Sequence, residues 1–114
     1  MFERSGIYYL YDQPTDMRKS FNTLGAIVMA RMNLDVMSGA GFVFINRRKT
    51  HLKMLRWEGD GFSLYFKRLE SGTFEHLCGL NEYRLSYENL LLILHGIETQ
   101  KISKRRRFSL GKTG

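Results

Sequence analysis

Three histidines and one cysteine are the residues of this chain whose types are most often used in catalysis or metal binding. His51, His76 and His95 have no serine or cysteine partner at the spacing of a known catalytic motif. His76 and Cys78 are two residues apart, but a structural zinc site needs four ligands and no CxxC or HxxxH pattern supplies the others. We therefore interpret this pair as a loop histidine beside a half-buried thiol, and we expect no metal or other cofactor.

Glu58 and Asp60 are close enough in sequence to suggest a carboxylate pair for a two-metal site. Two glycines interleave with them, however, and Asp-Gly supplies the positive φ angles that tight hairpins need. The pattern is therefore typical of a turn, and the protein is expected not to be an enzyme. A nuclease-like enzyme remains an alternative, which incubation of DNA with protein and magnesium would test.

Positive charge is concentrated in two parts of this 114-residue chain, whose formal net charge is +7. Residues 41–70 hold seven Lys or Arg against three acids, and residues 101–114 hold six against none. Such localised charge predicts a polyanion or an acidic protein as partner. The residues predicted to contact nucleic acid are Arg47, Arg48, Lys49, Lys53, Arg56, Lys67, Arg68, Lys104, Arg105, Arg106 and Arg107.

Aromatic residues are interleaved with the first of these basic groups. They are Phe42, Phe44, Trp57, Phe62, Tyr65 and Phe66. Interleaving suits the stacking of bases from a single strand, but a chain this short needs most of its rings for the core. We favour core packing. For the basic residues themselves, the plain alternative is a solvated surface or a solubilising tail.

The elements that position these residues follow from hydrophobic periodicity and turn residues. Residues 7–11 are predicted to form a strand that Pro14 closes, and a helix is predicted from Phe21, with Asp16 or Ser20 as N-cap and an end near Asn33 to Ser38. Residues 42–45 are apolar on both faces, as in a central strand.

After a basic turn at 46–50, residues 51–57 are predicted to form a strand with a bulge at Met54 and Leu55, which would place Lys53 and Arg56 on one face. Residues 62–69 fit both a helix and a strand, and we favour a short helix that ends before Gly72. A helix over 87–95 is predicted between Ser86 as cap and Gly96 as stop, where His95 complements the helix dipole.

Together these elements predict an α+β fold: a small antiparallel β-sheet, in hairpin or meander form, packed against two or three helices. We expect a single domain over residues 1–100 and a basic, mobile tail over 101–114. A lone cysteine favours a reducing cytoplasm, and no apolar run approaches the roughly 20 residues that span a bilayer. Export and membrane association are not expected.

Four blocks of sequence carry a resemblance to a known family. They are Pro-Thr-Asp-Met-Arg-Lys-Ser-Phe at 14–21, Phe-Val-Phe-Ile-Asn-Arg-Arg at 42–48, Leu-Lys-Met-Leu-Arg-Trp-Glu-Gly-Asp-Gly-Phe at 52–62 and Lys-Arg-Leu-Glu-Ser-Gly-Thr-Phe at 67–74. In order and spacing these blocks resemble the accessory proteins (TnpB, or second open reading frame) of the insertion-sequence class numbered sixty-six. The chain departs from that pattern at Arg56, where members often have an aromatic residue, and at Glu75, His76 and Leu77, where they have a Trp-Pro pair.

The resemblance implies a bacterial accessory protein that assists DNA transposition beside a separate transposase, with no known catalytic activity of its own. It supplies no list of binding residues, so the candidate site rests on charge. The expected partners are transposon-end DNA, through its backbone, and the transposase with other proteins of the element. An alternative is a protein interaction module that contacts an acidic patch of the transposase without touching DNA.

Overall fold

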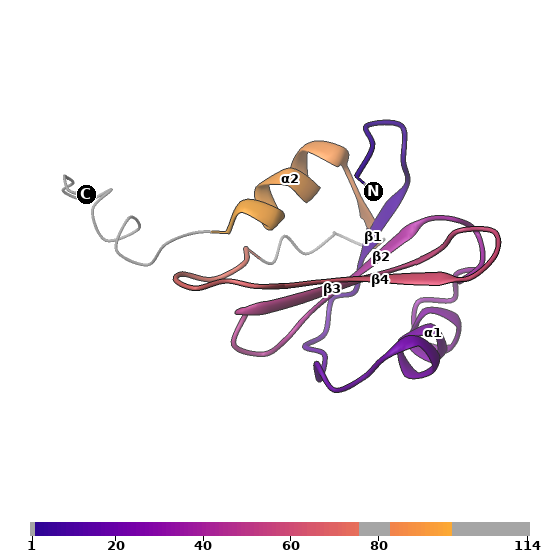
Figure 1. The fold of residues 1–114 in the computed structure, drawn as a ribbon, viewed down its shortest axis with the longest axis horizontal. Helices are drawn as coiled ribbons and strands as arrows, with labels where there is room; N and C mark the ends of the chain where they lie inside the picture. Colours follow the sequence, from indigo (N-terminus) through magenta and orange to yellow (C-terminus); the bar gives the residue numbers. More distant parts are fainter. Residues whose placement is uncertain (1, 76–82, 97–114) are drawn as a thin grey trace, which may run out of the picture.

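The computed structural model describes residues 2–75 and 83–96, and within them the chain forms a five-stranded sheet and two helices (Figure 1). The elements are β1 (Tyr8–Leu10), α1 (Phe21–Ala30), β2 (Gly41–Ile45), β3 (His51–Trp57), β4 (Phe62–Arg68), β5 (Arg84–Leu85) and α2 (Tyr87–His95). This arrangement confirms the α+β class. No helix in the described ranges is long and apolar enough to cross a membrane.

The strands lie in the order β4-β3-β2-β1-β5. The predicted antiparallel meander is confirmed for β2, β3 and β4, and β5 is antiparallel to β1. The pair β1 and β2 is parallel, with Tyr8 opposite Gly41, so the prediction of a wholly antiparallel sheet is wrong at this pair. A parallel pair needs a long crossover, and α1 with its loops provides it.

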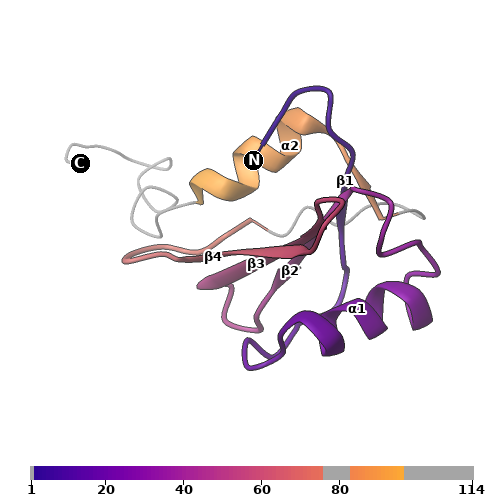
Figure 2. The same ribbon diagram turned by 45° about the vertical axis from the view of Figure 1, so that its right-hand side comes forward.

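The two helices cover opposite sides of the sheet (Figure 2). On what we call the α1 side, Leu24 and Val28 pack against Phe42, Phe44 and Leu55. On the α2 side, buried residues of α2 pack against the alternate positions of the same strands. These are Leu90, Ile93 and Leu94 from the helix and Val43, Ile45, Leu52 and Met54 from the sheet. All of β2 is consequently buried, as its unbroken apolar sequence predicts.

Both helices begin at a serine. The backbone N–H of Ser20 donates to Thr23 Oγ1 at 3.0 Å, and Ser86 Oγ accepts from the N–H of Asn89 at 3.1 Å. The predicted start and end of α2 are confirmed, with Gly96 at a φ of 75°. Helix α1 ends at Ala30, earlier than predicted, and Asn33 beyond it has a φ of 58° that a helix does not accommodate.

The predicted bulge in β3 is wrong, because β3 pairs without interruption with both neighbours. Met54 and Leu55 are both buried since each side of the sheet has its own cover, so consecutive apolar residues need no bulge. Without the bulge, Lys53 and Arg56 point to opposite sides of the sheet.

The helix favoured for residues 62–69 is also wrong, because Phe62–Arg68 form strand β4. A tight turn precedes it, in which the N–H of Glu58 donates to the carbonyl of Gly61 at 2.8 Å and Gly59 has a φ of 94°. This turn brings the segment back along β3, where all seven residues find partners, from Trp57 opposite Phe62 to His51 opposite Arg68. An isolated helix of this length is marginal, so strand pairing prevails.

The burial pattern predicts that the same substitution at two leucines changes the free energy of unfolding by very different amounts. Leu55 is fully buried in β3, whereas Leu92 of α2 is 55% exposed. Leu55→Ala is expected to lower the free energy of unfolding by about 2–5 kcal/mol through lost burial and a residual cavity. Leu92→Ala is expected to change it by about 0.5 kcal/mol or less. Urea unfolding measures both, and equal effects would contradict the described core.

Candidate functional site

Residues 46–50, which we call the basic turn, join β2 to β3. Arg47, Arg48 and Lys49 are all exposed there, as predicted, and no ion pair within the described ranges involves them. Backbone hydrogen bonds close the turn, because the N–H of Asn46 donates to the carbonyl of His51 at 3.1 Å and that of Lys49 donates to Asn46 at 3.0 Å. Three unneutralised cations therefore project from a fixed backbone.

Asn46 organises the basic turn through its side chain. Its Oδ1 accepts hydrogen bonds from the backbone N–H groups of Thr50 at 2.9 Å and His51 at 3.0 Å. Its amide nitrogen lies 3.2 Å from Thr50 Oγ1, to which it donates. One half-buried side chain thus satisfies backbone donors that the turn leaves without strand partners.

Lys49 occupies an unusual backbone conformation, with a φ of 62°. Glycine and, less often, asparagine adopt this left-handed backbone conformation, which costs other residues roughly 1–2 kcal/mol. The carbonyl of Lys49 accepts a 2.7 Å hydrogen bond from the N–H of Phe74, so a distant segment holds this conformation in place. The strain fixes a lysine where a glycine would fit more easily, which favours a role for its charge.

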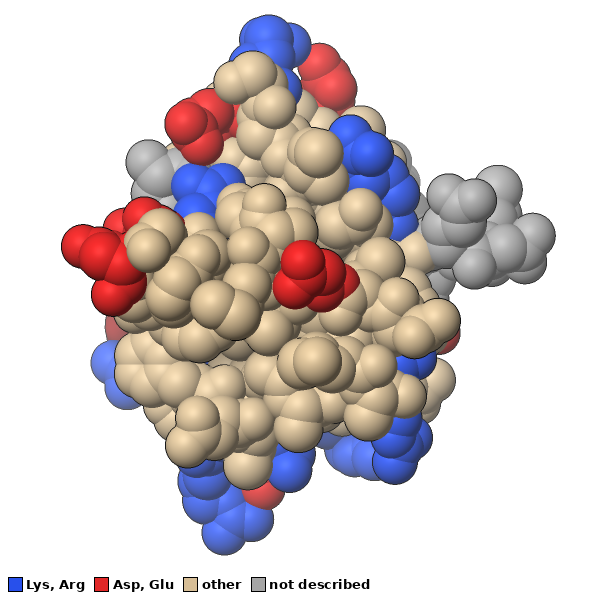
Figure 3. Space-filling view, turned by 90° about the vertical axis from the view of Figure 1, so that its right-hand side faces the viewer, with Lys and Arg blue, Asp and Glu red and all other residues tan. Residues whose placement is uncertain are grey.

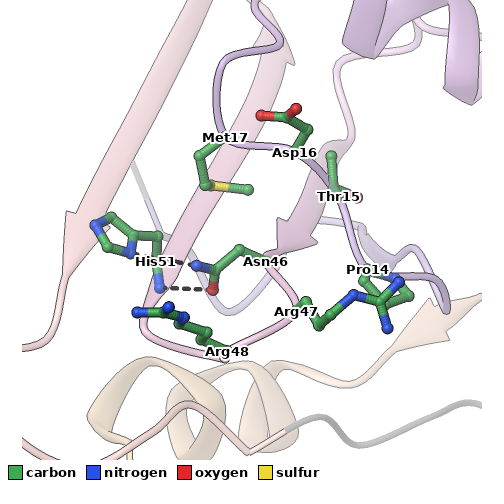
Figure 4. Close-up of a pocket in the computed structure, with 8 residues that line it drawn as sticks. All are labelled: Pro14, Thr15, Asp16, Met17, Asn46, Arg47, Arg48 and His51. Atoms are coloured by element: carbon green, nitrogen blue, oxygen red, sulfur yellow. Dashed lines mark hydrogen bonds between the residues drawn. The ribbon is translucent and has the colours of Figure 1, made fainter.

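A pocket of about 500 Å³ opens beside the basic turn (Figure 4). It is lined by Pro14, Thr15, Asp16, Met17, Asn46, Arg47, Arg48 and His51. In Figure 4 the side chains of Arg47 and Arg48 spread to opposite sides of Asn46. The segment after β1 forms the other wall, because the N–H of Thr15 donates to the carbonyl of Ile45 at 2.9 Å and so extends the parallel alignment of β1 with β2.

Asp16 is the acid of this pocket, and Arg18 neutralises it. The guanidinium of Arg18 donates to both carboxylate oxygens, at 2.6 Å from Nη2 and 3.1 Å from Nε, and its backbone N–H donates at 2.9 Å. The side-chain hydrogen bonds from Arg18 are the largest cause, and the backbone hydrogen bond is the next, of a pKa of Asp16 that lies well below its usual value. The same pairing raises the pKa of Arg18. The pocket therefore keeps the net positive charge of the basic turn.

Lys53 and Arg56 are not on the exposed surface where the charge pattern placed them, and the prediction that they share a face is wrong. Lys53 is on the α1 side and donates 2.8 Å hydrogen bonds to the carbonyls of Met17 and Lys19. Arg56 is on the α2 side, 3.3 Å from Glu3 and over the ring of Tyr8. Each is 9% exposed. These cations tie the N-terminal segments to the sheet, which leaves little surface for phosphate contact.

Two further cations lie at the end of β4, next to the basic turn. The N–H of Leu69 donates to the carbonyl of Thr50 at 3.0 Å, and Arg68 lies opposite His51. Arg68 is exposed and pairs with Glu70 at 3.1 Å. Lys67 donates to the carbonyl of Leu94 at 2.8 Å, so it contacts the C-terminal end of α2. Lys104, Arg105, Arg106 and Arg107 lie outside the described residues.

Residues considered for metal chemistry are not grouped in the described ranges, where no three His, Cys, Asp or Glu side chains come together. Glu58 and Asp60 lie in a turn, as predicted, and Glu58 accepts a 2.9 Å hydrogen bond from Ser63. His95 is exposed in the last turn of α2, also as predicted. The pair His76 and Cys78 lies outside the described residues.

The opposite end of the sheet has a different surface. Figure 1 places the turn between β3 and β4 at the end away from the basic turn. Figure 3 looks onto that end and shows mainly uncharged residues, with Lys and Arg mostly toward the margin and acidic groups near the centre, at the left edge and at the top. Lys and Arg therefore occur at this end as well, but its turn at residues 58–61 carries no run of basic residues like that of the basic turn.

The fold and site define a class: a small α+β protein that presents basic residues and a pocket at one end of a mixed sheet. The family described as "IS66 Orf2 like protein" matches residues 7–104, and the chain belongs to that family. It is therefore an accessory protein of an insertion sequence, which confirms the resemblance seen in the four sequence blocks.

Relatives of the chain occur in Sinorhizobium fredii. The uncharacterized protein y4jC is 40% identical over 62 residues, which cover 54% of this chain and 53% of y4jC. The uncharacterized protein y4hO is 38% identical over 60 residues, covering 53% and 52%. The chain thus spans about half the length of these curated relatives. No solved structure matches it.

The structure brings together two of the family-like blocks that are separate in sequence. Residues 14–17 and 46–48 form facing walls of the pocket. Sequence reasoning missed this wall because it did not foresee the parallel alignment of β1 with β2. It also missed Asn46, although an asparagine directly before consecutive basic residues is a turn signal in its own right.

The organising role of Asn46 can be tested by substitution. Asn46→Ala removes an acceptor from two backbone N–H groups and is expected to lower the free energy of unfolding by about 1–3 kcal/mol. Asn46→Asp keeps an acceptor at this position and is expected to cost less. Asn22→Ala, at an exposed position of α1, serves as a control for the loss of an amide. Chemical denaturation compares them, and equal losses for Ala and Asp would contradict the acceptor role.

Proposed function

We propose that this accessory protein assists transposition by binding the backbone of the element's DNA through the basic turn, without catalysing a reaction itself. The observation that carries the proposal is the exposure of Arg47, Arg48 and Lys49 on a backbone fixed by Asn46. Cations held in place lose less conformational freedom when they meet phosphates than cations on a loose segment do.

The chemistry of these side chains suits phosphates. An arginine guanidinium presents paired N–H donors that match a phosphate, and a lysine ammonium adds a compact charge. Arg68 adds an exposed guanidinium on the neighbouring strand. We include Lys104, Arg105, Arg106 and Arg107 as a second basic group, which follows α2 in the sequence. Contacts of this kind position DNA and read little of its sequence.

The pocket supports the same proposal because it lies directly against the basic turn. Its volume of about 500 Å³ gives a phosphate room between Arg47 and Arg48, and the carboxylate of Asp16 is occupied by Arg18. We propose the cytoplasm as the site of action and the element's transposase as a partner, as the family implies.

The proposal predicts DNA binding that weakens steeply with salt. Purified protein is titrated into a fluorescent duplex at several salt concentrations, and the anisotropy gives the affinity. Changing Arg47, Arg48 and Lys49 together to Gln is expected to weaken binding and to lower the slope of log K against log salt by about 1 for each phosphate contact removed.

A charge-matched control separates a local site from net charge. Changing Arg4, Arg31 and Arg84 to Gln removes the same three charges at exposed positions away from the basic turn. This control is expected to retain most of the affinity. Equal losses in both triple variants, or no binding by the wild type at low salt, would overturn the site. Capture of the transposase without DNA would then support the protein interaction module.

A further inference from the structure

Beyond the basic turn, aromatic side chains lie exposed on the α1 side of β4. Phe62 is 36% exposed and Phe66 is 54% exposed. Both are on the same side of the strand because they are four residues apart, which places their Cα atoms roughly 13 Å from each other along an extended chain. Leu64 lies between them and is half-buried. We call these three residues, with His51 and Trp57 of β3, the aromatic row.

The aromatic row is an ordered surface. The rings of His51 and Phe66 stack, with centroids 5.8 Å apart and an angle of 24° between their planes. Trp57 and Phe62 meet edge to face at 4.9 Å. The ammonium of Lys53 lies 5.2 Å from the centroid of Phe66 and is itself fixed by two backbone carbonyls. Each exposed ring of β4 thus has a partner on β3 that holds it.

The core on this side of the sheet does not require these two rings. Helix α1 packs on Phe42, Phe44 and Leu55, which are fully buried. From β4, only Leu64 packs against that cluster in the described part of the chain. Phe62 and Phe66 therefore present apolar area beyond what α1 covers, on a strand at the edge of the sheet.

The aromatic row adjoins the positively charged basic turn, and this neighbour indicates what kind of ligand would cover the row. His51 belongs both to the row and to the lining of the pocket, beside Arg47 and Arg48. Arg68 is the cross-strand neighbour of His51. The row therefore begins at the basic turn and runs away from it along β3 and β4. A ligand that follows this path needs negative charge at one end and flat apolar groups along its length.

We infer that the aromatic row binds unpaired bases, so that the DNA held by the basic turn is single-stranded where it crosses β4. This inference rests on the proposed function, which supplies the phosphate contacts. A duplex keeps its bases stacked inside, whereas a single strand exposes them to rings such as Phe62 and Phe66. The row accepts any base, because every base has a flat face and the row offers few hydrogen-bonding groups.

The test compares three probes of equal length: a single-stranded oligonucleotide, the same strand with abasic sites in place of its bases, and the duplex. The wild type is expected to bind the single strand about tenfold more tightly than the abasic strand, the usual effect of one stacked base. Phe66→Ala is expected to remove this difference, and Phe66→Tyr to retain it. Leu92→Ala, an exposed apolar residue on the α2 side, is expected to change nothing.

Trp57 gives an independent measurement, because it is the only tryptophan in the chain and contacts Phe62. Stacking of bases on the row is expected to quench its fluorescence with the single strand and not with the abasic strand. This readout uses the wild-type protein, so it decides the question even where Phe66→Ala fails to fold.

The outcomes separate the inference from the proposed function. Equal affinity for the single strand and the abasic strand, with no selective quenching, would overturn the aromatic row while leaving phosphate binding intact. Weakened binding in the basic-turn variant, with base preference in the wild type, supports both. Absence of DNA binding overturns both, and concentration-dependent dimerisation abolished by Phe66→Ala would assign the row to a second copy of the chain instead.

Discussion

The burial of β2 on both sides is the constraint on which the rest of the structure depends. Residues of this strand point alternately to two sides of the sheet, and all of them are apolar or glycine. Each side therefore needs its own helix, which α1 and α2 provide. The strand also needs partners on both edges, and β1 and β3 satisfy its backbone. Once β2 is fixed, the basic turn that follows Ile45 has one location, at the end of the sheet.

Local patterns made most of the elements predictable. Serine caps, a glycine stop and apolar periodicity marked α2, and the glycines at 59 and 61 marked the turn before β4. The errors arose where distant partners decide. The apolar residues of segment 62–69 fit both the helical and the strand periodicity, and only pairing with β3 selects the strand. Likewise, the parallel alignment of β1 depends on the crossover through α1, which no local pattern reveals.

The sequence allowed the charge of the candidate site to be predicted, but not the positions and burial of its side chains. Consecutive basic residues at 47–49 indicated an exposed turn, and the structure places them there. The same reasoning treated Lys53 and Arg56 as further surface cations, yet they are buried and bonded to segments more than 30 residues away in sequence. The residue type alone does not show whether a charged side chain faces solvent. An apolar neighbour on each side, such as Leu52 and Met54 around Lys53, is the local signal that a cation lies within a packed sheet.

Buried cations also explain how the two parts of the site hold together. Lys53 donates to the carbonyls of Met17 and Lys19, so it fixes the segment that forms one wall of the pocket. Its ammonium also lies against Phe66 in the aromatic row. An apolar side chain would leave those carbonyls without this donor in a partly buried setting, which is costly. A single buried charge thus couples the pocket wall to the exposed rings of β4, and the charge is useful because of where it is held rather than because it is accessible.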